Sequence, residues 1–177
     1  MNPPGPAAEQ TLLTYTCVTV PEHVYASPPE GELSLCDLRI AVTNHLTEPV
    51  YCPLLTIRLP VGAGARQLVA SGSGIIPLAT PATWSVTAIQ EDVLIVVPQD
   101  STARFTPAEH ALRQTVTPSL AIDLKGLRIN REPGTTDVEV IESAATTPDG
   151  PPSERTHSFE IIKRGLGLAT AGLAEEV

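Results

Sequence analysis

The chain has 177 residues, of which 42% are hydrophobic, only 3% are aromatic and 18 are proline, and this length suits one domain with tails. The net charge of −9 and the pI near 4.8 argue against nucleic acid and anionic membranes as partners. No run has the length of a transmembrane helix, and residues 1–13 lack the pattern of a signal peptide. We therefore expect a cytoplasmic protein, with non-classical export left open.

The first half of the chain predicts three strands after a flexible N-terminal arm, residues 1–10, which holds three prolines. Residues 11–20 are rich in β-branched side chains, and residues 33–43 and 50–59 alternate apolar with polar positions, as half-buried strands do. The turn at 44–49 predicts that the last two of these form a hairpin. Pro53 cannot donate to a strand ladder, so its end of the strand is expected at an edge or a bulge.

The middle of the chain is less regular. Residues 60–81 hold four glycines and no clean period, so we expect a long functional or mobile loop, or a short strand at 74–78 hidden within it. Strands are predicted at 84–90, 92–98 and 101–107. The second of these is apolar on both faces and is therefore expected in the centre of a sheet. Residues 108–114 allow one helical turn or plain loop.

Residues 118–142 give the strongest local pattern. Two alternating runs, centred on Ile122 and Val138, flank the turn sequence Asn130-Arg131-Glu132-Pro133-Gly134. Such a spacing predicts a β-hairpin with a longer loop. A proline-rich loop at 143–155 follows, and then a last strand at 156–163.

These elements predict an all-β domain over residues 11–164, with about eight strands and no βαβ alternation. The fold class that they favour is an antiparallel β-sandwich, with a closed barrel as the alternative. Residues 165–177, which hold three glycines, are expected to form a C-terminal tail or a short frayed helix.

Two segments resemble bacterial immunoglobulin-like sandwich modules. Residues 38–62 (LRIAVTNHLTEPVYCPLLTIRLPVG) are similar to their opening strands and turn, and residues 119–142 (SLAIDLKGLRINREPGTTDVEVIE) are similar to their closing strands. The alanine-, proline- and threonine-rich usage is similar to that of actinobacteria. The resemblance implies an immunoglobulin-like fold of a kind used in adhesins, assembly subunits and enzyme appendages; it implies no site residues.

The three cysteines are predicted to be buried, reduced thiols rather than a disulfide frame or a metal site. In the register of the expected hairpin, Cys36 lies near Ile57 and Cys52 near Ala41, so these two thiols do not face each other. Cys17 lies in the first predicted strand.

No local motif in the sequence carries a reaction. The four histidines lie far apart, without zinc-ligand spacing, and the serines at 71 and 73 lack a nucleophile-elbow pattern. The glycines at 62 and 64 match the start of the G-x-G-x-x-G dinucleotide-binding motif, but Gln67 occupies the position of its third glycine. Asp137 and Glu139 share one strand face, which is typical of a solvated surface. We therefore predict no catalytic residue, no metal and no cofactor; ligand-binding residues remain unassigned.

The primary functional hypothesis is a non-enzymatic interaction or assembly module, which binds a protein partner or itself through a sheet edge or its long loops. Apolar residues without an evident core role support it: Leu68, Val69, Ile75, Ile76, Leu166, Leu168 and Leu173. The alternative is a small-ligand or carbohydrate-binding sandwich that uses Trp84 and loop tyrosines, although Trp84 is favoured as a core residue and the tyrosines at 15, 25 and 51 are few and scattered. An enzyme, ranked last, would gather residues among His23, His45, His110, Asp123 and Glu139 in a deep pocket.

Overall fold

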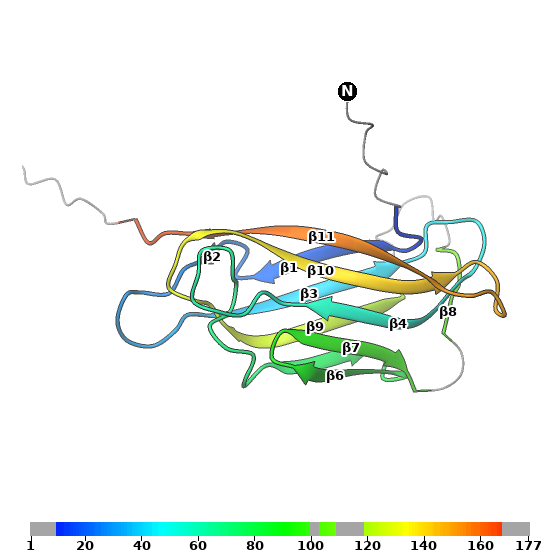
Figure 1. Ribbon diagram of the computed structural model, residues 1–177, viewed down its shortest axis with the longest axis horizontal. Coiled ribbons are helices and arrows are strands. Elements are labelled where there is room, and N and C mark those ends of the chain that lie inside the picture. Colours follow the sequence, from blue (N-terminus) through cyan, green and yellow to red (C-terminus); the bar gives the residue numbers. More distant parts are fainter. Residues whose placement is uncertain (1–9, 100–102, 109–118, 168–177) are drawn as a thin grey trace, which may run out of the picture.

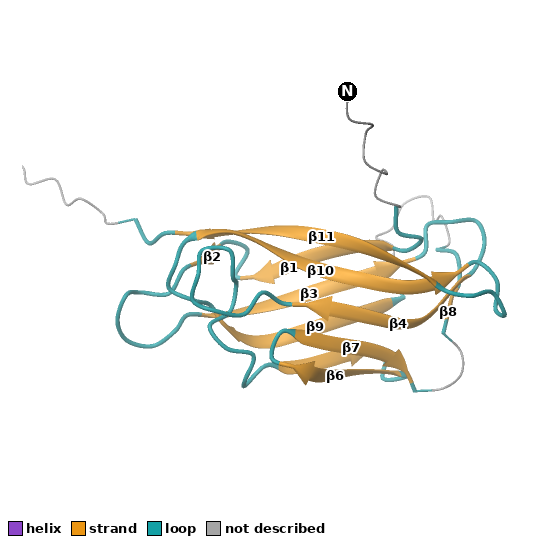
Figure 2. Cartoon of the chain, viewed as in Figure 1, coloured by secondary structure: helices purple, strands orange, loops and turns teal. Residues whose placement is uncertain are grey.

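A computed structural model describes residues 10–99, 103–108 and 119–167, and these form β-strands and loops without any helix (Figure 1, Figure 2). The strands within these ranges are β1 (Thr14–Val20), β2 (Val24–Tyr25), β3 (Leu35–Thr43), β4 (Val50–Arg58), β5 (Ile76–Thr80), β6 (Trp84–Gln90), β7 (Val93–Pro98), β8 (Arg104–Phe105), β9 (Leu120–Arg128), β10 (Gly134–Ala145) and β11 (Ser153–Arg164). The prediction of an all-β chain is confirmed. Most of the predicted arm (1–10) and C-terminal segment (165–177), and most of the possible turn at 108–114, lie outside the described residues.

The strands form two sheets that face each other. The smaller sheet has the order β1-β3-β9-β5, and the larger has the order β2-β11-β10-β4-β7-β6, with β8 paired to one end of β4. Every strand pairing is antiparallel except the short parallel one between β2 and β11. On one side the chain passes from β5 directly into β6, and these two strands contact each other. The arrangement is therefore sandwich-like and curls together along that side.

One aliphatic core fills the space between the sheets. Every second residue of β3 and β9 points into it, and so does every second residue of β4 and β10; Ile40, Ile122, Ile57 and Val140 are fully buried examples. Trp84 is 8% exposed and its ring lies 5.3 Å from that of Phe105, so the prediction of a core tryptophan is confirmed. Valine, isoleucine and leucine supply the bulk of the core, as the low aromatic content requires.

The predicted hairpin within residues 118–142 is wrong. Its two strands, β9 and β10, belong to different sheets: β9 pairs with β3 and β5, whereas β10 pairs with β11 and β4. The segment between them therefore crosses from one layer to the other. Alternating apolar residues show that one face of a strand is buried, and β9 and β10 do each bury one face in the same core. The alternation does not show which strand pairs with which.

The predicted hairpin of residues 33–43 and 50–59 is wrong for the same reason, since β3 and β4 also lie in different sheets. The register that placed Cys36 near Ile57 therefore does not exist. All three cysteines are nevertheless free thiols: Cys36 and Cys52 are buried and Cys17 is half-buried. Between the pairs Ser143–Leu54 and Ala145–Tyr51, β4 has one residue more than β10, and Pro53 lies in this bulge, so the expected bulge is confirmed. The central position of residues 92–98 is also confirmed, because β7 pairs with both β4 and β6.

Residues 60–81 are more ordered than their composition predicts. Leu68 and Val69 are almost fully buried in the core, so the inference that they lack a core role is wrong. Val69 bridges to Val61 and Ile129, which carries the loop across the end of the sandwich. The strand left open at 74–78 exists, displaced by two residues, as β5. Ile76 and Leu166 are exposed as expected, and Leu168 and Leu173 lie outside the described ranges.

Candidate functional site

A cleft of about 550 Å³ opens on the side of the molecule opposite the β5–β6 junction, between β1 of one sheet and β11 of the other. Its walls come from β1, the turn after it, β2 and the second half of β11. Twelve residues line it: Cys17, Val18, Thr19, Glu22, His23, Val24, Ser158, Phe159, Glu160, Ile161, Ile162 and Arg164. This volume lies in the range of ligand and peptide sites, so the cleft is the candidate site.

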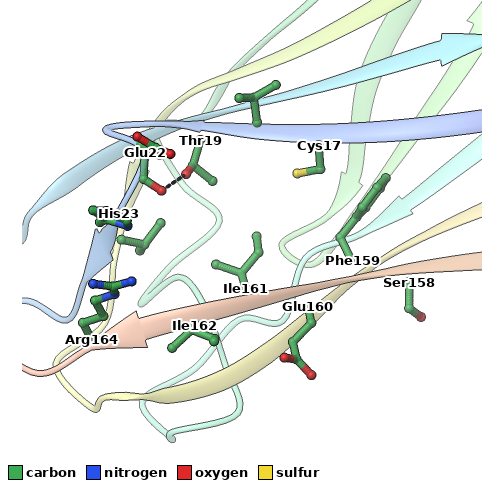
Figure 3. A pocket seen from close by; sticks show the side chains of 12 residues that line it. Cys17, Thr19, Glu22, His23, Ser158, Phe159, Glu160, Ile161, Ile162 and Arg164 are labelled. Carbon is green, nitrogen blue, oxygen red and sulfur yellow. Dashed lines mark hydrogen bonds between the residues drawn. The ribbon is translucent and has the colours of Figure 1, made fainter.

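Strand alternation decides which side chains enter the cleft. Figure 3 shows Cys17 of β1 and Phe159 and Ile161 of β11 directed into the space between the two strands, while Ser158, Glu160 and Ile162 point away from it. The inward side chains are buried or half-buried, and the outward ones are exposed. The floor of the cleft is therefore apolar and its rim is polar.

Along most of its length, the outer edge of β11 has no strand partner among the described residues. Arg164 accepts a hydrogen bond on its carbonyl from the amide of Ala26, next to β2, at 2.9 Å. Because backbone groups alternate sides along a strand, the residues that share the parity of Arg164 also direct N–H and C=O away from β10. The pairing of β10 with β11 is continuous, so this parity holds back to Glu154. In the part of the chain that the structure describes, no strand pairs with this edge between Glu154 and Glu160; from Ile162 onward the parallel pairing of Lys163 with Val24 occupies it.

Other sheet edges carry a proline or a bulge, and the two edges beside the cleft do not. β5 contains Pro77, and β6 has a bulge between Ala88 and Gln90; proline and bulges both disrupt a ladder. Neither the free stretch of β11 nor β1 contains proline, and neither is bulged in its registers with β10 and β3. The edges without proline or a bulge thus border the same opening.

The polar groups of the cleft do not form a catalytic arrangement. Burial, followed by the neighbouring Cys36, raises the pKa of the Cys17 thiol to about 11, so the thiol is protonated at neutral pH and is a poor nucleophile. Thr19 donates its hydroxyl hydrogen to the backbone carbonyl of Glu22 at 2.9 Å, an interaction that shapes the turn. Within the described ranges, no three histidine, cysteine or carboxylate side chains are grouped as metal ligands, and no helix is long and apolar enough to span a bilayer.

A buried carboxylate fixes β1 beside the cleft. Glu142 of β10 is fully buried and accepts hydrogen bonds from the amides of Leu12 and Leu13 and from the Tyr15 hydroxyl, the last at 2.8 Å. Burial chiefly, and then the Glu142 carboxylate, raises the pKa of Tyr15. His157 packs between two rings, 5.8 Å from Tyr15 and 4.7 Å from Phe159. These contacts join β1 to β10 and β11 next to the cleft.

A second polar network closes the end of the sandwich near β2. Lys163 is 1% exposed, and its Nζ donates to Oδ1 of Asn130 and to the carbonyl of Glu132, both at 2.6 Å. The Asn130 side-chain amide in turn donates to the carbonyls of Gly62, Gly64 and Gln67, each at 2.8 Å. Burial lowers the pKa of Lys163, and Glu132 opposes that shift. Every amine contact is to a neutral oxygen that holds loops together, so this cluster is structural.

The structure separates the residues that the enzyme and carbohydrate hypotheses would need. Of the histidines, only His23 lines the cleft, while His45 is exposed in a loop and His110 lies outside the described residues. Asp123 faces outward on β9 with its carboxylate 3.8 Å from Arg39, and Glu139 lies on the outer face of β10, as expected. Trp84 is buried and offers no stacking platform. The sequence predicted the strand β11, but alternation contains no signal that its far edge is free.

Comparisons with known proteins assign no family. No family model and no curated protein matches the chain. Three similar solved structures are BslA, a bacterial hydrophobin (TM-score 0.39, 10% identity, 88% of this chain and 98% of that chain covered); AvmM, which catalyses macrocyclization in alchivemycin A biosynthesis (0.38, 12%, 93% and 100%); and AggB, a minor subunit of aggregative adherence fimbriae type I from Escherichia coli (0.33, 13%, 84% and 98%). Such low identities and TM-scores assign this chain no function.

Proposed function

We propose that this protein is a non-enzymatic interaction module that receives an extended polypeptide segment along the outer edge of β11. The observation that carries the proposal is the regular edge of β11 beside an apolar cleft, where the outward backbone groups of Glu154, Thr156, Ser158 and Glu160 have no strand partner among the described residues. An added strand gains main-chain hydrogen bonds from the edge, and alternate side chains of that strand enter the cleft. Phe159 and Ile161 provide the apolar contacts at the floor.

The chemistry of the cleft defines the segment that fits. Its side chains that face the cleft must be apolar at every second position, because they meet Cys17, Phe159 and Ile161. Burying one such aliphatic or aromatic side chain contributes about 1.5–3 kcal/mol. Basic residues flanking the segment are favoured, because the chain carries a net charge of −9. The expected ligand is therefore an extended segment with alternating apolar residues and basic flanks.

The proposal is tested by selecting seven-residue peptides, the length of Glu154–Glu160, from a displayed library and measuring their affinities by isothermal titration calorimetry. Ser158→Pro removes an N–H that points away from β10, so it blocks strand addition without breaking the native ladder. We expect it to weaken peptide binding at least tenfold, with Ser158→Ala as the matched control. Peptides that bind Ser158→Pro as tightly as the wild type, or a selection that yields no alternating apolar peptide, would contradict the proposal.

We also propose that the fold is of the immunoglobulin-like type, which the resemblance in residues 38–62 and 119–142 implies. The order β1-β3-β9-β5 supports it, since it matches the A-B-E-D order of constant-type immunoglobulin sheets. The neighbours β11-β10-β4 match the G-F-C order of the facing sheet. The chain departs from that pattern in β6 and β7, which follow β5 in the sequence and extend the larger sheet beside β4.

A further inference from the structure

We propose that Lys163 and Asn130 form a covalent cross-link, an isopeptide bond between the lysine amine and the asparagine side chain. The two residues come from different layers of the sandwich, since Asn130 follows β9 and Lys163 lies near the end of β11. They are 33 positions apart in the chain. The described contacts are those of the pair before it reacts. This modification site is separate from the β11 edge and does not depend on the proposed function.

The amine is held close to the carbon atom that it would attack. Lys163 is 1% exposed and Asn130 is 2% exposed, and the lysine Nζ lies 2.6 Å from Oδ1 of Asn130. Because a C=O bond is about 1.2 Å long, Nζ is at most about 3.8 Å from Cγ, near the separation of roughly 3–3.5 Å at which pre-organised groups react. Burial also lowers the pKa of Lys163, which increases the share of neutral, nucleophilic amine.

The surroundings of the Asn130 side chain fit the reacting group better than the intact amide. A carboxamide nitrogen carries two hydrogens, yet Nδ2 lies 2.8 Å from each of three carbonyl oxygens, those of Gly62, Gly64 and Gln67. As it leaves, this nitrogen gains a third hydrogen and can donate one to each oxygen. The backbone N–H of Glu132 donates to Oδ1 at 3.3 Å, where negative charge develops during the attack. Groups that match the transition state better than the ground state accelerate a reaction.

The reaction needs no further reactant. Nζ forms a bond to Cγ, the bond from Cγ to Nδ2 breaks, and its electron pair stays on the departing nitrogen. One proton moves from Nζ to Nδ2, so that ammonia is released. The carboxylate of Glu132, whose charge acts on the amine, can carry that proton. The new bond would tie the end of β11 to the segment after β9, where hydrogen bonds already join them.

Mass spectrometry of the intact full-length chain tests the cross-link, because its formation removes one ammonia, about 17 Da, from the mass of the sequence. We expect this loss in most molecules after prolonged incubation of the folded chain at about pH 8. Trypsin should then release residues 129–131 joined to residues 156–164, without cleavage after Lys163. Reductive methylation in urea should modify Lys125, which is the other lysine of the chain, and leave Lys163 unmodified.

Two substitutions show whether the ammonia comes from this pair. Lys163→Arg keeps the positive charge and removes the nucleophile, so the loss of mass should disappear. Lys125→Arg, at an exposed position of β9, is the matched control and should keep it. Asparagine can also release ammonia by forming a succinimide with its own backbone, but that product persists in Lys163→Arg and gives no joined peptides. Thermal unfolding verifies that both variants fold.

Three results would overturn the cross-link: a chain that keeps its full mass, a loss of ammonia that persists in Lys163→Arg, or methylation of Lys163 in urea to the same extent as Lys125. The peptide and methylation measurements use the wild-type chain, so they decide the question even if Lys163→Arg does not fold. Peptide binding at the β11 edge is measured separately, and its failure would overturn the proposed function alone.

Discussion

Single buried polar residues determine how the ends of this sandwich are closed. Asn130 and Glu142 each satisfy several backbone groups that have no place in a strand ladder. A buried polar group left without a partner costs about 1–3 kcal/mol. These two positions should therefore be more sensitive to substitution than an average core position of the same size.

Removing the Asn130 amide should release the loop over residues 62–67. Asn130→Ala deletes three donations at 2.8 Å and one acceptor of Lys163, so we expect the free energy of unfolding to fall by about 3 kcal/mol. Urea denaturation measures the loss, and hydrogen exchange should show faster exchange in the loop. Thr135→Ala, exposed on β10, serves as the control and should change stability by less than about 0.5 kcal/mol.

Converting the Glu142 carboxylate to an amide should loosen β1. Glu142→Gln places an NH₂ group toward the amides of Leu12 and Leu13 or toward the Tyr15 hydroxyl, all of which are donors. We expect a loss of about 1–3 kcal/mol, read by urea denaturation. Glu139→Gln, on the outer face of the same strand, should leave stability nearly unchanged. Equal effects of the two substitutions would contradict a structural role for the buried carboxylate.

At the scale of elements, the joint between the sheets depends on close backbone approach. Gly72 precedes β5 and packs against the turn between β6 and β7, where an added Cβ would lie 2.0 Å from the carbonyl oxygen of Glu91. Since the clash is with backbone, one of the two segments must move. This contact explains why a segment that composition alone assigns to flexible loop is held in place beside the junction.

Gly72→Ala should therefore destabilise the protein by about 1–3 kcal/mol, the usual cost of overpacking. Gly167→Ala is the matched control, because a Cβ there has nothing within 4 Å. Thermal unfolding of the two variants compares them directly. If Gly72→Ala unfolds at the temperature of the control, the two segments are not in contact in solution.

At the scale of the whole molecule, groups buried in protonated form predict how stability depends on pH. Burial raises the pKa of Cys36 from 9.0 to about 11 and, with the neighbouring Glu142 adding to it, that of Cys52 to about 12. Burial likewise raises that of Cys17 to about 11 and lifts that of Tyr15 above its ordinary 10.0. The folded chain keeps these protons while the unfolded chain releases them. Their stabilising effect is therefore complete below pH 9 and decreases as the pH rises from 9 to 12.

We expect the free energy of unfolding to fall between pH 9 and pH 11, measured by urea denaturation at each pH. Lys163 acts in the opposite direction. Its pKa is lowered, so the free energy of unfolding contributed by this group rises with pH up to 10.5. The effect of this one amine is smaller than the combined effect of the three thiols and the phenol. Tyr15→Phe should make the free energy of unfolding fall less steeply above pH 10, because the phenol of the unfolded wild-type chain ionises there and that of the folded chain does not. Unchanged stability up to pH 11 would show that these groups are not buried as described.

The strand pattern was readable from the sequence because alternation records which side of a strand is buried, and most strands begin and end within a few residues of their predicted bounds. Strand partners were not readable. β9 and β10 have the spacing of a hairpin and yet occupy different sheets, since a loop of that length can either fold back or cross the core. Leu68 and Val69 were misjudged for a related reason, because their burial depends on Ile129 and other distant residues.

Composition and alternation are local properties, and they are sufficient to predict an acidic, aliphatic, all-β chain. The three-dimensional packing alone shows that β11 has no strand neighbour besides β10 and the short β2, and that it faces β1 across the opening, within the described residues. An edge is defined by the absence of a pairing, and pairing between strands far apart in sequence is fixed by the packing of the whole core rather than by the residues of the strand concerned.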